Sequence, residues 1–232
     1  MSVRLFLAGG VFLFLFLAIY MPAYAHGVHG HDQEFITNVA GAHPFPFMYL
    51  GAKHMVTGYD HLAYLAGVIF FLSRVKDVFK FVSLFALGHS ITLLLGVIGG
   101  IHVNPHLVDA IIGLSVCYKA LENLGVFNAQ GGSFIDPAIA VFGFGLVHGF
   151  GLSSKLQELN LNPDGLIANM LSFNLGVEIG QIIALIFLLG LFFGLRSLRN
   201  FERIAIWVNM ILFAAGLVLF GMQMTGFFVG MN

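Results

Sequence analysis

The chain has 232 residues, of which 59% are hydrophobic and only 9% are charged. Soluble globular domains carry about 25% charged residues, so this composition excludes such a domain and indicates a membrane protein. The formal net charge of −1 argues against nucleic acid as a partner, and the lone Cys117 excludes an internal disulfide.

Residues 1–25 have the layout of a secretory signal peptide. Arg4 precedes an apolar stretch from Leu5 to Tyr20, and Ala23-Tyr24-Ala25 is a small-residue pattern of the kind that signal peptidase accepts. We predict that this segment is cleaved. A retained first spanning helix is the alternative, because the apolar stretch is long for a signal.

Residues 26–46 are polar and are predicted to form a non-cytoplasmic tail. The tail contains four histidines: His26, His29, His31 and His43. Pro44 and Pro46 are expected to prevent a regular helix here. Cleavage after Ala25 would place a terminal amine beside the first three imidazoles, which predicts weak capture of a divalent metal ion. A polar tail that merely contains histidines is the alternative.

Six apolar windows follow, and each is long enough to cross a bilayer as a helix, which takes roughly 20 residues. They cover residues 47–72, 79–99, 105–124, 137–156, 167–193 and 204–229. Lys and Arg gather in the loops after the first and fifth windows and are absent from residues 100–104 and 157–166. The positive-inside rule then places the mature N-terminus outside. We therefore predict an all-α, multi-pass protein of a bacterial-type inner membrane, with residues 47–232 forming one six-helix transmembrane domain.

Ionisable residues lie near the middle of four of these windows. Such a group costs upward of ~2.5 kcal/mol at the bilayer centre, so it must face protein or water. The residues concerned are Asp60, His61, His89, His148 and Glu178. Their shared depth predicts one polar site half-way across the membrane. For any single histidine, a hydrogen bond within the core is the simpler explanation.

His54 and His61 share a face of the first window but lie about 10.5 Å apart along a straight helix. That separation is too large for one ion, so joint coordination requires a kink at Gly58. Without the kink, His54 would form an outer site and His61 a deeper one. Asp60 is expected either to bind the ion or to orient a histidine of another helix, as carboxylates beside metal-bound histidines do.

The fifth window carries a polar stripe of three residues, Asn174, Glu178 and Gln181, within an arc of about 60°. We expect this stripe to face inward, with Asn174 and Gln181 orienting the metal ligands. Hydrogen bonding between helices explains the stripe equally well.

The third and fourth windows contain further polar and small residues. Lys119 and Glu122 are i, i+3 neighbours near the inner end of the third window and are expected to neutralise each other, whereas Asp109 lies near its outer end. Four glycines surround His148 in the fourth window: Gly143, Gly145, Gly149 and Gly151. Close approach of a helix, or of an ion with its water, explains them equally well.

Imidazole combined with carboxylate and amide oxygens suits a divalent transition metal rather than calcium or magnesium. The predicted metal ligands are His54, Asp60, His61, His89, His148 and Glu178. Because a ligating imidazole must first lose its proton, acidification is expected to weaken uptake. The sequence contains no ATP-binding loop, which excludes direct ATP drive within this chain.

Four motifs resemble those of the HupE/UreJ family of membrane proteins over roughly residues 45–195. The motifs are Gly51–Leu62 with its His-x5-Asp-His core, Leu87–Leu93, His148–Gly151 and Phe173–Gln181. The resemblance implies a nickel permease, or a cobalt permease, that serves nickel enzymes, with His54, Asp60 and His61 as the motif residues. The chain departs from the hydrogenase-associated pattern because it lacks a proline next to His54.

We therefore predict a permease or binding protein for a divalent metal, with nickel or cobalt favoured, zinc or copper open, and no enzymatic activity. Three alternatives remain. A haem or redox protein could use two of the central histidines as axial ligands. An intramembrane hydrolase could use Ser153 or Ser154 with His148 as base. A metal-sensing or assembly partner would bind without transport, and a homo-oligomer and a client metalloenzyme stay open as partners.

Overall fold

The computed structural model describes residues 36, 39–72, 74–127, 135–158 and 162–230. The predicted signal at residues 1–25 and the predicted metal-capturing histidines, His26, His29 and His31, lie outside these ranges. All regular secondary structure within the described ranges is helical, which confirms the predicted all-α class.

The described residues form seven helices, α3 to α9. Their bounds are α3 Pro44–Thr57, α4 Tyr59–Ile69, α5 Val75–Gly99, α6 Pro105–Asn123, α7 Pro137–Gln157, α8 Leu166–Arg196 and α9 Phe201–Val229. Helices α5 to α9 match the last five predicted windows to within a few residues. Among the described residues, the four helices α5, α7, α8 and α9 are long and apolar enough to cross a membrane.

The prolines of the predicted tail begin a helix instead of preventing one. Pro44 is the first residue of α3, where a missing N–H is harmless because the first helical N–H groups have no acceptor within the helix. Asn169 of α8 holds this start in place, since its side chain accepts a hydrogen bond from the N–H of His43 and donates one to the carbonyl of Gly41. The expectation that residues up to 46 form no helix is therefore wrong.

The first predicted window is interrupted at Gly58. This residue is extended, with φ −72° and ψ 96°, and it ends α3 and precedes α4. Its N–H donates to the carbonyl of His54 at 2.9 Å, and its own carbonyl accepts from the N–H of Leu62 at 3.0 Å. The two helices therefore meet at a break whose backbone groups remain hydrogen-bonded.

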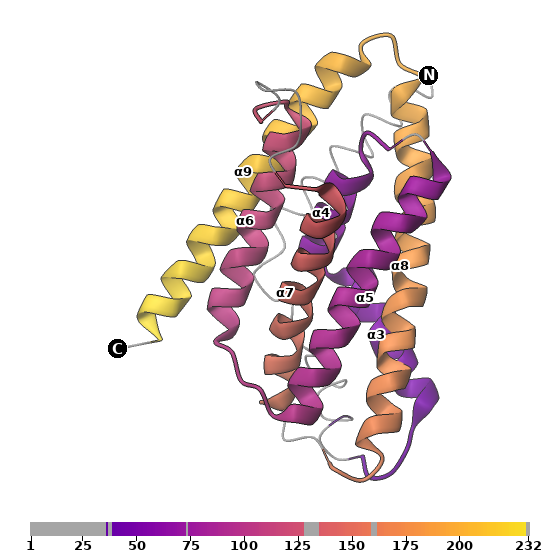
Figure 1. The fold of residues 1–232 in the computed structure, drawn as a ribbon, viewed down its shortest axis with the longest axis vertical. Helices are drawn as coiled ribbons and strands as arrows, with labels where there is room; N and C mark the ends of the chain where they lie inside the picture. The colour runs from indigo at the N-terminus through magenta and orange to yellow at the C-terminus, as the bar shows by residue number, and fades with distance from the viewer. Residues whose placement is uncertain (1–35, 37–38, 73, 128–134, 159–161, 231–232) are drawn as a thin grey trace.

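The helices of the described ranges pack most closely as three pairs: α3 with α8, α5 with α7, and α6 with α9. Figure 1 shows α6 and α9 along one side of the bundle, α3, α5 and α8 along the other, and α4 and α7 between them. Without a hydrophobic driving force in lipid, close packing between small residues holds such pairs together.

Glycines bring the backbones of each pair into contact. A Cβ on Gly176 of α8 would collide with the carbonyl oxygen of Met48 in α3, and a Cβ on Gly145 of α7 would collide with that of Phe85 in α5. In the third pair, a Cβ on Gly216 of α9 would lie 2.7 Å from the carbonyl oxygen of Gly113 in α6. Close helix packing is thus the reason for these glycines, including Gly145.

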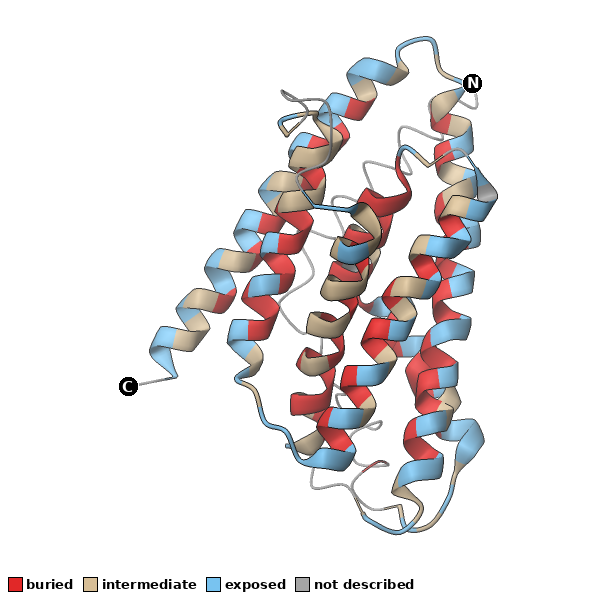
Figure 2. Cartoon of the chain, viewed as in Figure 1, coloured by how far each residue is buried: buried red, intermediate tan, exposed pale blue. Residues whose placement is uncertain are grey.

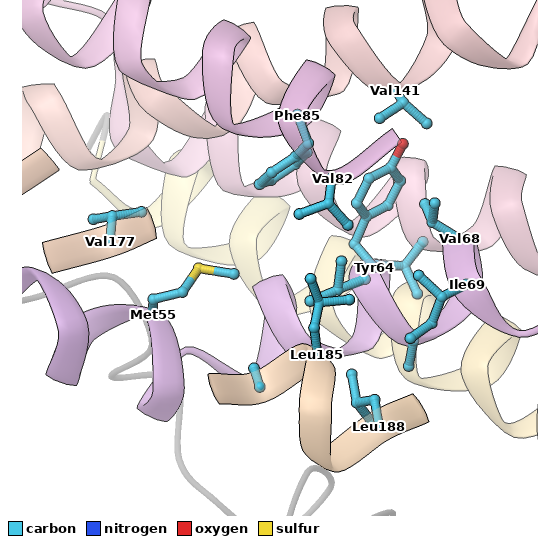
Figure 3. Packing of buried hydrophobic residues seen from close by; sticks show 14 of the residues in the cluster. Met55, Tyr64, Val68, Ile69, Val82, Phe85, Val141, Val177, Leu185 and Leu188 are labelled. Atoms are coloured by element: carbon cyan, nitrogen blue, oxygen red, sulfur yellow. The ribbon is translucent and has the colours of Figure 1, made fainter. Parts of the chain in front are cut away.

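Figure 2 shows that buried residues lie along the inner faces of the bundle. Large apolar side chains are exposed on the outside of the long helices. Tyr64 is 2% exposed, and Figure 3 shows its ring beside Val82 with the hydroxyl pointing toward Val141. The Tyr64 hydroxyl oxygen has no hydrogen-bond partner among the described residues. An apolar outer surface, with the polar groups of the described residues buried against protein, is the arrangement expected of a bundle in lipid.

Candidate metal site

The break at Gly58 folds two histidines of the first window onto each other. His54 lies in the last turn of α3 and His61 in the first turn of α4. Their ring centroids are 5.1 Å apart. A kink at Gly58 is the condition for both residues to bind one ion, and the structure has this kink.

Two more imidazoles join them from neighbouring helices. His89 of α5 and His148 of α7 place their ring centroids 5.8 Å and 5.1 Å from that of His61. We call His54, His61, His89 and His148 the histidine cluster. All four side chains are buried.

The nitrogen atoms of three members are close enough to share one ion. One ring nitrogen from each of His54, His61 and His89 lies within 4.8 Å of the others. Nitrogen ligands at about 2.05 Å around a tetrahedral metal are about 3.3 Å apart. The donors therefore lie somewhat wider than in a closed site, and small side-chain rotations would bring them into coordination range.

Hydrogen bonds select the ring nitrogen that two members of the cluster, His148 and His61, present. The Nδ1–H of His148 donates to the carbonyl of Phe144 at 2.7 Å, which leaves the lone pair on Nε2. The Nδ1 of His61 lies 3.1 Å from Oδ1 of Asp60, and a carboxylate accepts, so Nδ1 carries the proton here too. Asp60 therefore contacts His61, the next residue along the chain. Such carboxylate contacts hold metal-binding imidazoles in the required tautomer.

His89 is the most informative member of the cluster. It is 1% exposed, and neither ring nitrogen has a hydrogen-bond partner among the described residues. Burying a polar group without a hydrogen bond costs about 1–3 kcal/mol on mutational scales. A ligand that binds the ring would remove this penalty.

The close packing of α5 on α7 fixes the position of His89. The Thr92 hydroxyl, one turn further along α5, donates to the carbonyl of Leu146 in α7 at 2.7 Å. A Cβ on Gly149 would collide with the carbonyl oxygen of His89. Gly149 therefore serves close helix packing next to the cluster, whereas nothing lies within 4 Å of a Cβ on Gly143.

The polar stripe of α8 is only partly directed inward. Gln181 is buried and donates to the carbonyl of Val82 in α5 at 3.3 Å. Helices α5 and α8 run antiparallel (Figure 1). His89 lies seven residues after Val82 in α5, and Asn174 lies seven residues before Gln181 in α8. Asn174 is therefore at the depth of His89. Asn174 is buried, and its Oδ1 has no hydrogen-bond partner within the described ranges.

Glu178 is exposed, so the expectation that it faces inward with the cluster is wrong. Gly176 and Gly180 turn the buried side of α8 toward α3, as their contacts with Met48 and Ala52 show. Two residues correspond to 200° around a helix, which directs Glu178 away from those contacts. The predicted stripe therefore straddles the edge of the buried face.

Two ion pairs involve residues of α6. Lys119 Nζ is 2.6 Å from Glu122 Oε2 within α6, as the sequence predicts. Lys155 Nζ of α7 is 2.7 Å from Asp109 Oδ2 of α6, a contact that the sequence did not indicate. The spacing of His148 and Lys155, seven residues apart on one helical face, is the signal that connects Lys155 to the cluster.

The sequence matches a family model described as HupE / UreJ protein over residues 30–231. The chain belongs to the HupE/UreJ family. This confirms the resemblance of the four motifs and, with the apolar helices, indicates a multi-pass membrane protein of a family associated with nickel and cobalt transport and not known as enzymes. Comparisons with curated proteins and with solved structures found no match.

The geometry disfavours the catalytic and haem alternatives for this HupE/UreJ protein. The Ser153 hydroxyl donates to the carbonyl of Phe150 in its own helix, and Ser154 accepts from the N–H of Val103. Neither of these contacts is the serine–histidine hydrogen bond that activates a nucleophile. The cluster rings pack against one another, which leaves no space for a haem macrocycle between them.

Proposed function

We propose that the protein is a membrane permease for a divalent transition metal ion, nickel or cobalt, and that the histidine cluster is its binding site half-way across the bilayer. The observation that carries the proposal is His89, a buried imidazole without a hydrogen bond among the described residues, next to two histidines that offer nitrogen donors. An isolated polar group of this kind is expensive in a membrane interior unless it has a ligand.

The donor set fits the proposed substrate. Imidazole nitrogen is a ligand for nickel, cobalt, zinc and copper, whereas calcium and magnesium prefer oxygen. Asp60 adds one negative charge, which attracts a cation and stabilises the metal-binding tautomer of His61. Asn174 supplies an amide oxygen at the same depth as His89.

The spacing of the donors favours transport over permanent binding. Because the nitrogens of His54, His61 and His89 lie up to 4.8 Å apart, coordination requires them to move together and release requires them to separate. A permease must release its substrate, and a site that closes only around the ion does so more readily than a rigid four-ligand cage.

The break between α3 and α4 is also a feature of transport proteins. We propose that the two helices cross the membrane as one interrupted span, which gives six crossings with helices α5 to α9. Non-helical backbone at membrane depth is tolerated where protein surrounds it, and interrupted helices form substrate sites in many transporters. Gly58 is buried, in agreement with that rule.

The orientation follows from the distribution of positive charge. Arg74, Lys76, Arg196 and Arg199 lie at one end of the bundle, where Arg196 donates to the carbonyl of Ile69. We propose that this end faces the cytoplasm and that residues 100–104 face outward. The histidines at positions 26, 29 and 31 would then collect the ion on the outer side.

Metal binding and vesicle uptake test the proposal. Purified wild-type protein is expected to bind about one Ni²⁺ or Co²⁺ per chain and to accumulate the ion in vesicles. Changing a residue that only orients a metal ligand weakens binding by about 10- to 100-fold. His89→Ala removes a proposed ligand itself, so it is expected to weaken binding at least as much. The control is His102→Ala, an exposed histidine in the loop before α6, which is expected to behave like wild type.

Two results would contradict the proposal. One is wild-type protein without bound metal whose vesicles accumulate neither ion above empty liposomes. The other is His89→Ala with unchanged affinity and uptake. Stoichiometric binding without uptake would instead identify a metal-binding accessory protein.

A further inference from the structure

A buried ion pair lies on the proposed route between the outer surface and the histidine cluster. Asp109 of α6 is 1% exposed, and its Oδ2 lies 2.7 Å from Nζ of Lys155 in α7. The Lys155 side chain is 22% exposed, so the pair connects a partly exposed lysine side chain to a buried carboxylate.

The pair shares a helix face with the cluster. His148, Gly151 and Lys155 are spaced i, i+3 and i+7 along α7, which places them on one side of that helix. A Cβ on Gly151 would lie 3.4 Å from Oδ1 of Asp109, so the small residue allows the carboxylate to approach α7 between His148 and Lys155. Asp109 is therefore about one helical turn from His148, toward the end of the bundle at residues 100–104.

The pair also interacts electrostatically with the cluster. Lys155 lies close enough to act on His54, and Asp60 close enough to act on Asp109. Asp60 and Asp109 are the two buried carboxylates of the described ranges. One acid thus lies beside the central site and the other lies outward of it.

Stability alone explains the pair poorly. Lys155 lies in the last turn of α7, where the helix dipole favours its positive charge. Removing two charges from water, however, offsets much of this gain, and apolar replacements of buried ion pairs are often as stable. The position of the pair between the outer surface and a cation-binding cluster calls for a further role.

We propose that Asp109 is a second cation-binding site on the outer half of the route, and that the ammonium group of Lys155 occupies it until a divalent ion displaces it. This inference rests on the proposed function. A doubly charged ion attracts the carboxylate about twice as strongly as an ammonium group at the same distance. The tethered lysine therefore discriminates against monovalent ions, which cannot displace it.

The displacement is a simple exchange. The divalent ion takes the place of the ammonium group at Asp109, and Lys155, already partly exposed, turns toward water. When the ion moves on to the histidine cluster, Lys155 returns to Asp109 and the carboxylate is again neutralised.

Equilibrium dialysis of the purified full-length protein against Co²⁺ or Ni²⁺ tests the inference. All variants carry His89→Ala, which weakens the central site. In this background Lys155→Met is expected to gain one bound ion per chain, with an affinity at least tenfold higher than that of the parent. The added change Asp109→Asn is expected to abolish the gain. Lys80→Met, the same change at an exposed lysine that lies over the Phe81 ring, is the control and is expected to gain none.

Two further variants guard against misfolding and against a purely structural role. Lys155→Gln keeps an amide donor for Asp109 and is expected to show the same gain, so it replaces Lys155→Met if that variant does not fold. In otherwise wild-type protein, Lys155→Arg keeps the charge and can bind the carboxylate with two hydrogen bonds. It is expected to fold normally and to slow uptake severalfold, whereas a structural role predicts wild-type uptake.

The inference is overturned if neither neutral variant gains an ion or if Asp109→Asn leaves the gain intact. It is also overturned if Lys155→Arg transports like wild type. Because the dialysis is done with the central site weakened, its result does not depend on uptake. A gained ion in a protein whose wild type fails to bind or accumulate metal would refute the proposed function alone.

Discussion

His54 and His61 are seven residues apart in the chain, yet their ring centroids lie 5.1 Å apart. In a continuous helix the same residues would be separated by about 10.5 Å along the axis. The extended conformation of Gly58 shortens this distance by ending one helix and starting another. The first two ligands of the proposed site thus come from a single short segment of chain.

Gly58→Ala is expected to weaken metal binding at least tenfold. A Cβ at this position would lie 3.0 Å from the carbonyl oxygen of His54 and 3.0 Å from Nδ1 of His61, so both groups must move. Overpacking of this kind costs about 1–3 kcal/mol. Titration of Co²⁺ into the purified variant measures the effect. Gly190→Ala in α8, where nothing lies within 4 Å of the added Cβ, is the control. Equal affinities for both variants would show that the break does not position the ligands.

Asp60→Asn is expected to lower metal affinity by about 10- to 100-fold, the usual effect of changing a carboxylate that orients a metal-bound histidine. The amide oxygen of the substituted side chain would still accept a hydrogen bond from Nδ1 of His61, so the fold and the contact persist while the negative charge is lost. Isothermal titration gives the affinity, and the melting temperature checks the fold. Wild-type affinity in a folded Asp60→Asn protein would remove Asp60 from the proposed site.

The sequence predicted the features that depend on the length of the apolar stretches and on the free-energy cost of burying a charge in the membrane. Windows of about 20 apolar residues locate α5 to α9, because a bilayer allows little else of that composition. The positions of His61, His89 and His148 at one depth indicated a shared site, and the structure brings all three together.

Features that depend on which side of a helix meets its neighbour were predicted less well. Apart from its polar stripe, the fifth window is apolar, so its periodicity did not reveal that glycines direct one side to α3 and leave Glu178 exposed. From the sequence, the break at Gly58 could be stated only as the condition for His54 and His61 to bind the same ion. A glycine inside an apolar helix is common in membranes, and its conformation depends on the tertiary contacts.

Gly149→Leu is expected to destabilise the protein and to abolish metal binding. The added side chain would collide with the carbonyl oxygen of His89 and with the Thr92 hydroxyl, which forces α5 away from α7 and moves His89 out of the cluster. Gly143→Leu in the same helix has open space around its Cβ and is the matched control. Thermal unfolding and Ni²⁺ titration of both variants make the comparison. If both bind alike, the close α5–α7 contact is not required for the site.

Asn123→Leu is expected to lower stability without changing the intrinsic metal affinity. The Asn123 amide donates to the carbonyl of Gly67 in α4 at 2.8 Å and to Oδ1 of Asn209 in α9 at 2.9 Å, so one side chain connects three helices. Hydrogen bonds between membrane helices contribute about 0.6 kcal/mol on average and up to about 1.7 kcal/mol. We therefore expect a loss of about 1–2 kcal/mol in the free energy of unfolding, measured by denaturant titration.

A double-mutant cycle separates the two contacts of Asn123. Asn209 also donates to the carbonyl of Ala205 in its own helix, so Asn209→Leu loses an interhelical contact and an intrahelical one. The double variant is expected to be more stable than the sum of the single losses predicts, by about 0.6 kcal/mol, because the shared hydrogen bond is counted twice in that sum. Strictly additive losses would show that the Asn123–Asn209 contact contributes nothing to holding α9 against α6.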